Sequence, residues 1–134
     1  MIVAVSATKL GIGAEVTGLD ISQPMNKKTI ARRRELFLRH LVLVYRNPVL
    51  SREDHKQFAH YFGELHVYPS RRRDLKTTGD LEIFVIDTPA DAEQSNGEAW
   101  HSDVSCEVIP PMASLLYVTK LPENVGGDTM FANM

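Results

Sequence analysis

The stretch Lys27–Tyr45, KKTIARRRELFLRHLVLVY, decides the fold class, because it joins two elements of different periodicity. From Lys27 to His40 the apolar residues recur at helical spacing near one face, and Arg32–Arg34 fall largely on the opposite, solvated face. Leu41–Tyr45 is a continuous apolar run of strand length. The stretch therefore predicts a helix that leads into a buried strand.

Shorter signals on either side of this stretch predict a second helix and two further strands. Ser51 is a good N-cap, Asp54 follows three residues later, and Gly63 is a stop signal, which together frame a helix of about 11 residues. Towards the N-terminus, Ile2–Val5 is short and β-branched, and glycines bracket another strand-like piece in residues 11–18.

The second half of the chain is dominated by predicted strands. Leu81–Ile86 and Ala113–Val118 have the composition of buried strands, and Thr129–Ala132 begins one more. A polar loop, Asp87–Ala99, and a turn, Pro122–Gly127, separate them. With two helices in the first half, this order predicts an α+β or mainly β domain whose helices pack outside a sheet.

Length, charge and cysteine content limit the classes of function. The 134 residues suit one domain, and a net charge of −2 argues against a protein built to hold nucleic acid. Cys106, which we expect to be a small core residue, is the single cysteine, so an internal disulfide and a Cys-rich zinc site are excluded. The sequence shows neither a signal peptide nor a membrane span, and we expect a cytoplasmic protein.

The segment Trp100–Val104, WHSDV, carries the side chains best suited to chemistry. If it is a strand, His101 and Asp103 point into one cavity, because residues i and i+2 share a face. Imidazole and carboxylate suit Fe(II), as two of the three protein ligands of a non-haem iron site. Charged residues make up 24% of the chain, so such a pair also arises by chance. The pair alone leaves both interpretations open.

Other short motifs surround the pair in a fixed order: Ile12–Val16 with Gly18, Arg39–His40 before the apolar run, Phe62–His66, Pro110–Pro111, Leu121–Pro122 and Gly126–Thr129. With these motifs the chain resembles, over essentially its whole length, the taurine dioxygenase (TauD/TfdA-like) family of Fe(II)- and 2-oxoglutarate-dependent dioxygenases. The resemblance implies a double-stranded β-helix (jelly-roll, cupin-like) core with N-terminal flanking helices. It also implies Fe(II) as cofactor, 2-oxoglutarate and O2 as cosubstrates, and hydroxylation of a small molecule with succinate and CO2 as coproducts.

The same resemblance assigns roles to individual residues. His101 and Asp103 match the family's first metal histidine and its carboxylate ligand, and Thr129 matches the threonine that contacts 2-oxoglutarate. The residues expected near substrate are His66, Tyr68, Arg71 and Val104. Trp100 is expected to pack under the site. His66 fits the role of an ordinary loop residue equally well.

Three positions depart from the taurine-specific pattern. Tyr68 stands where a histidine for the sulfonate is expected, Arg71 replaces a tyrosine, and Gly97 replaces an asparagine. Taurine therefore does not follow from the resemblance. Tyr68 can donate a hydrogen bond and Arg71 can pair with an anion, so we expect a small sulfonate, sulfate ester or carboxylate.

The family's second metal histidine and the arginine for the far carboxylate of 2-oxoglutarate lie downstream of the family's Gly-Gly-Asp-Thr motif. The chain ends at Met134, so we expect the N-terminal portion of one domain, with its C-terminal half missing and no activity of its own. The alternative is a non-catalytic half-domain that acts as a binding or self-association module, since unpaired sheet edges favour association into a homo-oligomer.

Overall fold

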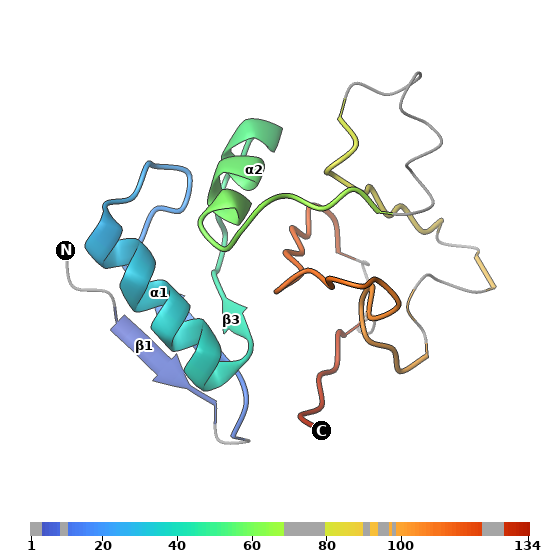
Figure 1. Cartoon of the computed structure of the whole chain (residues 1–134), viewed down its shortest axis with the longest axis horizontal. Helices are drawn as coiled ribbons and strands as arrows, with labels where there is room; N and C mark the ends of the chain where they lie inside the picture. Colours follow the sequence, from blue (N-terminus) through green and yellow to red (C-terminus); the bar gives the residue numbers. More distant parts are fainter. Residues whose placement is uncertain are drawn as a thin grey trace. The chain divides into compact units, whose positions relative to one another are not determined.

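The computed structural model describes residues 4–8, 11–68, 80–89, 92–93, 97, 99–121 and 128–134 (Figure 1). The chain divides into two compact units, Met1–Phe62 with Asp128–Met134, and Gly63–Gly127. No helix among the described residues is long and apolar enough to cross a membrane.

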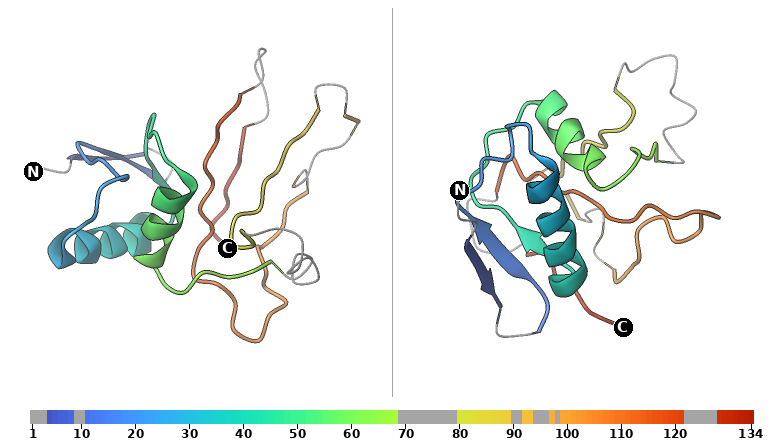
Figure 2. Two further views of the ribbon diagram at one scale, coloured as in Figure 1. Left: turned by 90° about the horizontal axis from the view of Figure 1, so that it is seen from above. Right: turned by 60° about the vertical axis from the view of Figure 1, so that its left-hand side comes forward.

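The first unit contains a three-stranded mixed sheet of order β1-β2-β3, with β1 at Ala4–Ala7, β2 at Ala14–Thr17 and β3 at Leu43–Val44. β1 and β2 pair antiparallel, with Ala4 opposite Thr17, and lie side by side in Figure 2. β2 and β3 pair parallel, with Ala14 opposite Leu43. A parallel pair needs a crossover connection, and α1 lies in this one.

Helix α1 spans Lys27–His40, as the sequence predicts. Asn26 caps its first turn, because the side-chain oxygen accepts a hydrogen bond from the Thr29 amide at 2.9 Å. The helix ends where Leu41 adopts a φ of 65°, a conformation that cannot continue a helix. The predicted strand Leu41–Tyr45 is present only as the two residues of β3.

Helix α2 spans Arg52–His60 and begins with the predicted cap. The Ser51 hydroxyl accepts from the Asp54 amide at 3.1 Å, while the Asp54 carboxylate accepts from the Ser51 amide at 2.9 Å. The Ser51 hydroxyl also donates to the Asp54 carboxylate at 2.8 Å, and the two bonds that this carboxylate accepts, from the Ser51 amide and hydroxyl, lower the pKa of Asp54. The helix ends at Tyr61, before the predicted stop at Gly63.

The core of the first unit is built by one strand, the loop after it and both helices. Its buried apolar residues come from β2, the following loop, α1 and α2: Ala14, Val16, Ile21, Leu36 and Phe58. Phe58 makes edge contacts with Tyr45 and Phe62, with ring centroids 5.6 and 5.7 Å apart. Such aromatic pairs add roughly 0.5–1.5 kcal/mol each to area burial.

Arg33 corrects the sequence prediction for the arginine triplet, because it is only 2% exposed. It faces the core three residues before the buried Leu36, and its guanidinium lies 4.7 Å from the Tyr45 ring centroid and 4.2 Å from that of Phe58. Nε donates to the Tyr45 hydroxyl at 3.2 Å, whereas Nη2 has no hydrogen-bond partner among the described residues. Burial lowers the pKa of Arg33.

The predicted strands of the second half are wrong for the described residues. Leu81–Ile86, Ala113–Val118 and Thr129–Ala132 carry no strand pairing, although exposure alternates along Ala113–Val118 as it does in a strand. The extended course of residues 80–89 and 113–121 can be followed in Figure 2. A sequence shows the alternation of side chains that is typical of a strand, but hydrogen-bonded pairing also needs a partner strand. The described chain thus has a small mixed sheet and two helices, and no jelly roll is seen in it.

Candidate metal centre

The structure brings His101 and Asp103 together in the second unit. Nε2 of His101 lies 3.2 Å from Oδ1 of Asp103, and the two side chains are 56% and 50% exposed. The segment is not a strand, since residues 100–102 have no strand pairing and Asp103–Cys106 form a turn. The two donor atoms nevertheless converge, with an open approach.

A backbone contact orients the imidazole of His101. Nδ1 lies 2.8 Å from the carbonyl oxygen of Ala99. A carbonyl only accepts, so Nδ1 carries the hydrogen and a neutral imidazole has its lone pair on Nε2. The free donor atom is therefore the one that faces Asp103.

A side-chain contact orients the carboxylate of Asp103. The Ser114 hydroxyl donates to Oδ2 at 2.6 Å, which leaves Oδ1 toward His101. Ser114 could not be identified from the sequence. It stands 11 residues away, and no local pattern connects it to the pair.

The two free donors fit one divalent ion. Ligand atoms bound about 2.1 Å from one metal are about 3.0 Å apart at the octahedral angle and about 3.4 Å apart at the tetrahedral angle, and the observed 3.2 Å lies between these values. Hydrogen bonds on the outer atoms of both ligands are the usual support of a metal site. Within the described part of the chain, no third histidine, cysteine or carboxylate joins the pair.

Unusual backbone conformations flank the pair. Val104 has a φ of 51°, an outlier for a β-branched residue, in a turn where the Glu107 amide donates to its carbonyl at 3.1 Å. Gly97 has a φ of +88°, and a Cβ added there would lie 3.4 Å from Cε1 of His101. Glycine adopts such a φ without strain, so Val104 is the strained residue of the two, and strain of this kind clusters at functional sites.

The other predicted residues are spread over the chain. Tyr68 stacks on Phe84, with ring centroids 5.4 Å apart and an interplanar angle of 9°, and His66 is half-buried. Thr129 is exposed and belongs to the first unit. Arg71 lies outside the described residues. Their roles, like the role of Val104 near substrate, stay predictions.

Two expectations around the pair are wrong. Trp100 is 68% exposed and so does not pack under the site. Cys106 is exposed and is not a core residue. Trp100 precedes the turn Asp103–Cys106 and Cys106 is its last residue, and the described chain has no sheet there to cover them.

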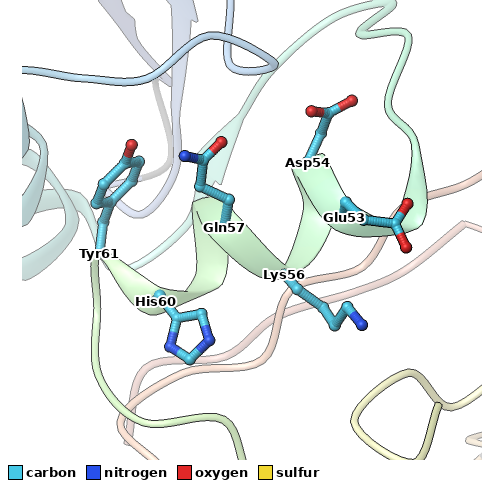
Figure 3. A pocket seen from close by; sticks show the side chains of 6 residues that line it. All are labelled: Glu53, Asp54, Lys56, Gln57, His60 and Tyr61. Carbon is cyan, nitrogen blue, oxygen red and sulfur yellow. The ribbon is translucent and has the colours of Figure 1, made fainter. Parts of the chain in front are cut away.

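A surface hollow on α2, shown in Figure 3, differs from the pair of His101 and Asp103 because its side chains do not converge. Its lining side chains belong to the helix and its C-cap: Glu53, Asp54, Lys56, Gln57, His60 and Tyr61. Figure 3 shows these side chains spread along the helix, with no common point toward which they converge. They form no cradle for a ligand.

Comparisons with known proteins agree on one family. The family model of the taurine catabolism dioxygenase TauD, TfdA family matches residues 4–134. An alkylsulfatase of Acinetobacter baylyi is 31% identical over 123 residues, which are 91% of this chain and 37% of that protein. An alpha-ketoglutarate-dependent sulfonate dioxygenase of Saccharomyces cerevisiae is also 31% identical, over 91% of this chain and 31% of its own length.

Among solved structures, a taurine dioxygenase from Burkholderia xenovorans is 32% identical, with a TM-score of 0.45 over 46% of this chain and 22% of that one. The chain spans about a third of the length of the alkylsulfatase and sulfonate dioxygenase that it matches.

Proposed function

We propose, because this chain belongs to the taurine catabolism dioxygenase TauD, TfdA family, that it is the N-terminal portion of an Fe(II)- and 2-oxoglutarate-dependent dioxygenase. The chain covers 37% and 31% of the two relatives, which supports the proposal that it is one portion of a longer protein. The distal histidine and the arginine for 2-oxoglutarate would come from the rest of that protein, so residues 1–134 alone are inactive.

One observation carries the proposal: the 3.2 Å approach of His101 Nε2 and Asp103 Oδ1, each with its other polar atom already held. These two atoms hold Fe(II), and the Thr129 hydroxyl contacts 2-oxoglutarate. Bound iron with 2-oxoglutarate supplies the O2 chemistry that hydroxylates a substrate carbon and yields succinate and CO2. The chain's own contribution is to fix both donor atoms on one side of the metal and to leave the other positions free.

The proposed substrate is a small anion, namely an organic sulfate ester or sulfonate, with a carboxylate as the third choice. The names of the two relatives support the first two classes. Tyr68 is held by its stack on Phe84 with its ring 44% exposed, so its hydroxyl can donate to an anionic group. Arg71 supplies a positive charge, and His66 and Val104 complete the proposed surroundings of the substrate.

Succinate formation from 2-oxoglutarate in the complete protein tests this function, with ferrous iron, air, and alkyl sulfates or sulfonates as candidate substrates. We expect substrate-stimulated turnover that falls at least about 100-fold in His101→Ala and Asp103→Ala. His60→Ala, which changes an exposed histidine of α2, is the matched control and should keep full turnover. Unchanged turnover in both ligand variants would rule out these ligands.

A second function, a non-catalytic self-association module, is favoured by exposed apolar side chains in the second unit. Val108 and Ile109 are 98% and 85% exposed. Sedimentation of residues 1–134 separates the two proposals, since a monomer at all concentrations would exclude the association module.

A further inference from the structure

We propose that Ser114 is a positioning residue for the metal centre, which holds the Asp103 carboxylate so that one oxygen faces the ion; this inference rests on the proposed function. Ser114 Oγ lies 2.6 Å from Asp103 Oδ2. A hydroxyl that donates to a carboxylate at this distance makes a strong, charge-assisted hydrogen bond. The bond connects the turn at Asp103–Cys106 with the extended segment Ala113–Val118.

The geometry shows how this bond sets the coordination mode. A free carboxylate rotates about its Cβ–Cγ bond and offers either oxygen, or both, to a metal. The bond from Ser114 fixes the rotation of the carboxylate and takes up one lone pair of Oδ2, so that Oδ1 is the less engaged oxygen, and it lies 3.2 Å from Nε2 of His101. Ser114 therefore favours binding through a single oxygen, at the distance from the imidazole that one ion requires.

A plain surface hydrogen bond is the competing explanation. Ser114 and Asp103 are both exposed, and a hydrogen bond between exposed groups contributes little to stability. If that were its whole role, its loss would change the stability of the fold slightly and leave metal affinity unchanged. A positioning role predicts the reverse, namely a change in metal affinity with little change in melting temperature. Outer hydrogen bonds of this kind change metal affinity about 10–100-fold.

The test compares Ser114→Val with Ser114→Thr in the complete protein. Valine and threonine have the same shape and differ in the hydroxyl group alone. The dissociation constant for Mn(II), measured by electron paramagnetic resonance of the free ion, requires no turnover. We expect Ser114→Val to bind about 10-fold more weakly or worse, and Ser114→Thr to stay within about 3-fold of the unmodified protein.

Ser105→Ala is the matched control, because within the described residues the Ser105 side chain makes only a long 3.4 Å contact, with the carbonyl of Ser102. Its affinity should stay within about 2-fold. If the valine and threonine variants both bind as tightly as the unmodified protein, the role of the hydroxyl is overturned. If Ser114→Val and Ser114→Thr weaken Mn(II) binding equally, Ser114→Ala is measured next. An affinity of Ser114→Ala equal to that of the unmodified protein would overturn the inference.

Failure of the proposed function can be distinguished from failure of the role of Ser114. If His101→Ala binds Mn(II) as tightly as the unmodified protein, the metal does not sit at the pair, and the role of Ser114 fails with it. If His101→Ala loses affinity while Ser114→Val does not, only the inference about Ser114 is wrong.

Discussion

Residues 4–62 and residues 63–121 differ in what holds them together. The first region has backbone ladders, two capped helices and an aromatic core around Phe58. The described part of the second has no helix or strand, and its candidate centre is fixed by two hydrogen bonds, from Ser114 and to the Ala99 carbonyl. The comparison indicates that regular structure and chemistry are separated along this chain.

The largest expected effect on stability comes from replacing one phenylalanine in each region and comparing the two losses. Phe58→Ala removes a ring that is 4% exposed and should lower the free energy of unfolding by about 3–5 kcal/mol. Phe84→Ala removes a ring that is 43% exposed and stacked on Tyr68, and should lower it by about 1 kcal/mol. Urea denaturation measures both. Equal losses would show that the second region has a core of its own.

Arg33→Met should raise the free energy of unfolding by about 1 kcal/mol. The desolvation of the buried guanidinium, which lowers its pKa, outweighs its contacts with the Tyr45 and Phe58 rings, and methionine keeps apolar contact with both. Arg32→Met is the control, because Arg32 is exposed and pairs with Glu35 at 2.7 Å, so its loss should change little. A marked loss of stability in Arg33→Met would show that the charge stabilises this core.

An alanine at position 97 or at position 11 would be strained to a similar extent, so this pair of substitutions compares the two regions. Both glycines have positive φ, +88° and +83°, so each alanine should cost about 1 kcal/mol. Only the Cβ at position 97 meets His101, whereas nothing lies within 4 Å of the one at position 11. We therefore expect weaker metal binding in Gly97→Ala alone. Equal metal affinities in the two variants would show that Gly97 does not support the centre.

The smallest expected effect is that acid destabilises the first turn of α2. The backbone and side-chain hydrogen bonds from Ser51 lower the pKa of Asp54 from its ordinary 3.8. A lowered pKa means that the carboxylate stabilises the folded state above pH 3.8, and that this contribution disappears as the pH falls through the lower, folded value. Amide chemical shifts of α2 should follow this titration, which Asp54→Asn should abolish. A titration that persists in Asp54→Asn would assign it elsewhere.

Local signals explain what the sequence predicted correctly. The helical period and the cap at Ser51 are encoded within a few residues, so both helices are found where they were expected, whereas the cap at Asn26 is a finding of the structure. The pairing of His101 with Asp103 is also local, and their donor atoms converge without the strand from which the prediction began.

Non-local contacts explain the failures. Arg33 is charged, so a polarity pattern places it in solvent, yet two rings from other elements, Tyr45 and Phe58, cover it. Ala113–Val118 has the period of a strand, but pairing depends on a partner that the period does not identify. Ser114 reaches Asp103 across 11 residues, a distance over which the sequence carries no signal.

Anaerobic calorimetric titration of the complete protein with ferrous iron tests the central claim most directly. We predict one site per chain, with affinity reduced at least about 100-fold in both His101→Ala and Asp103→Ala and unchanged in His60→Ala. Stoichiometric binding of equal affinity in the unmodified protein and in both ligand variants would contradict the assignment of the iron to this pair.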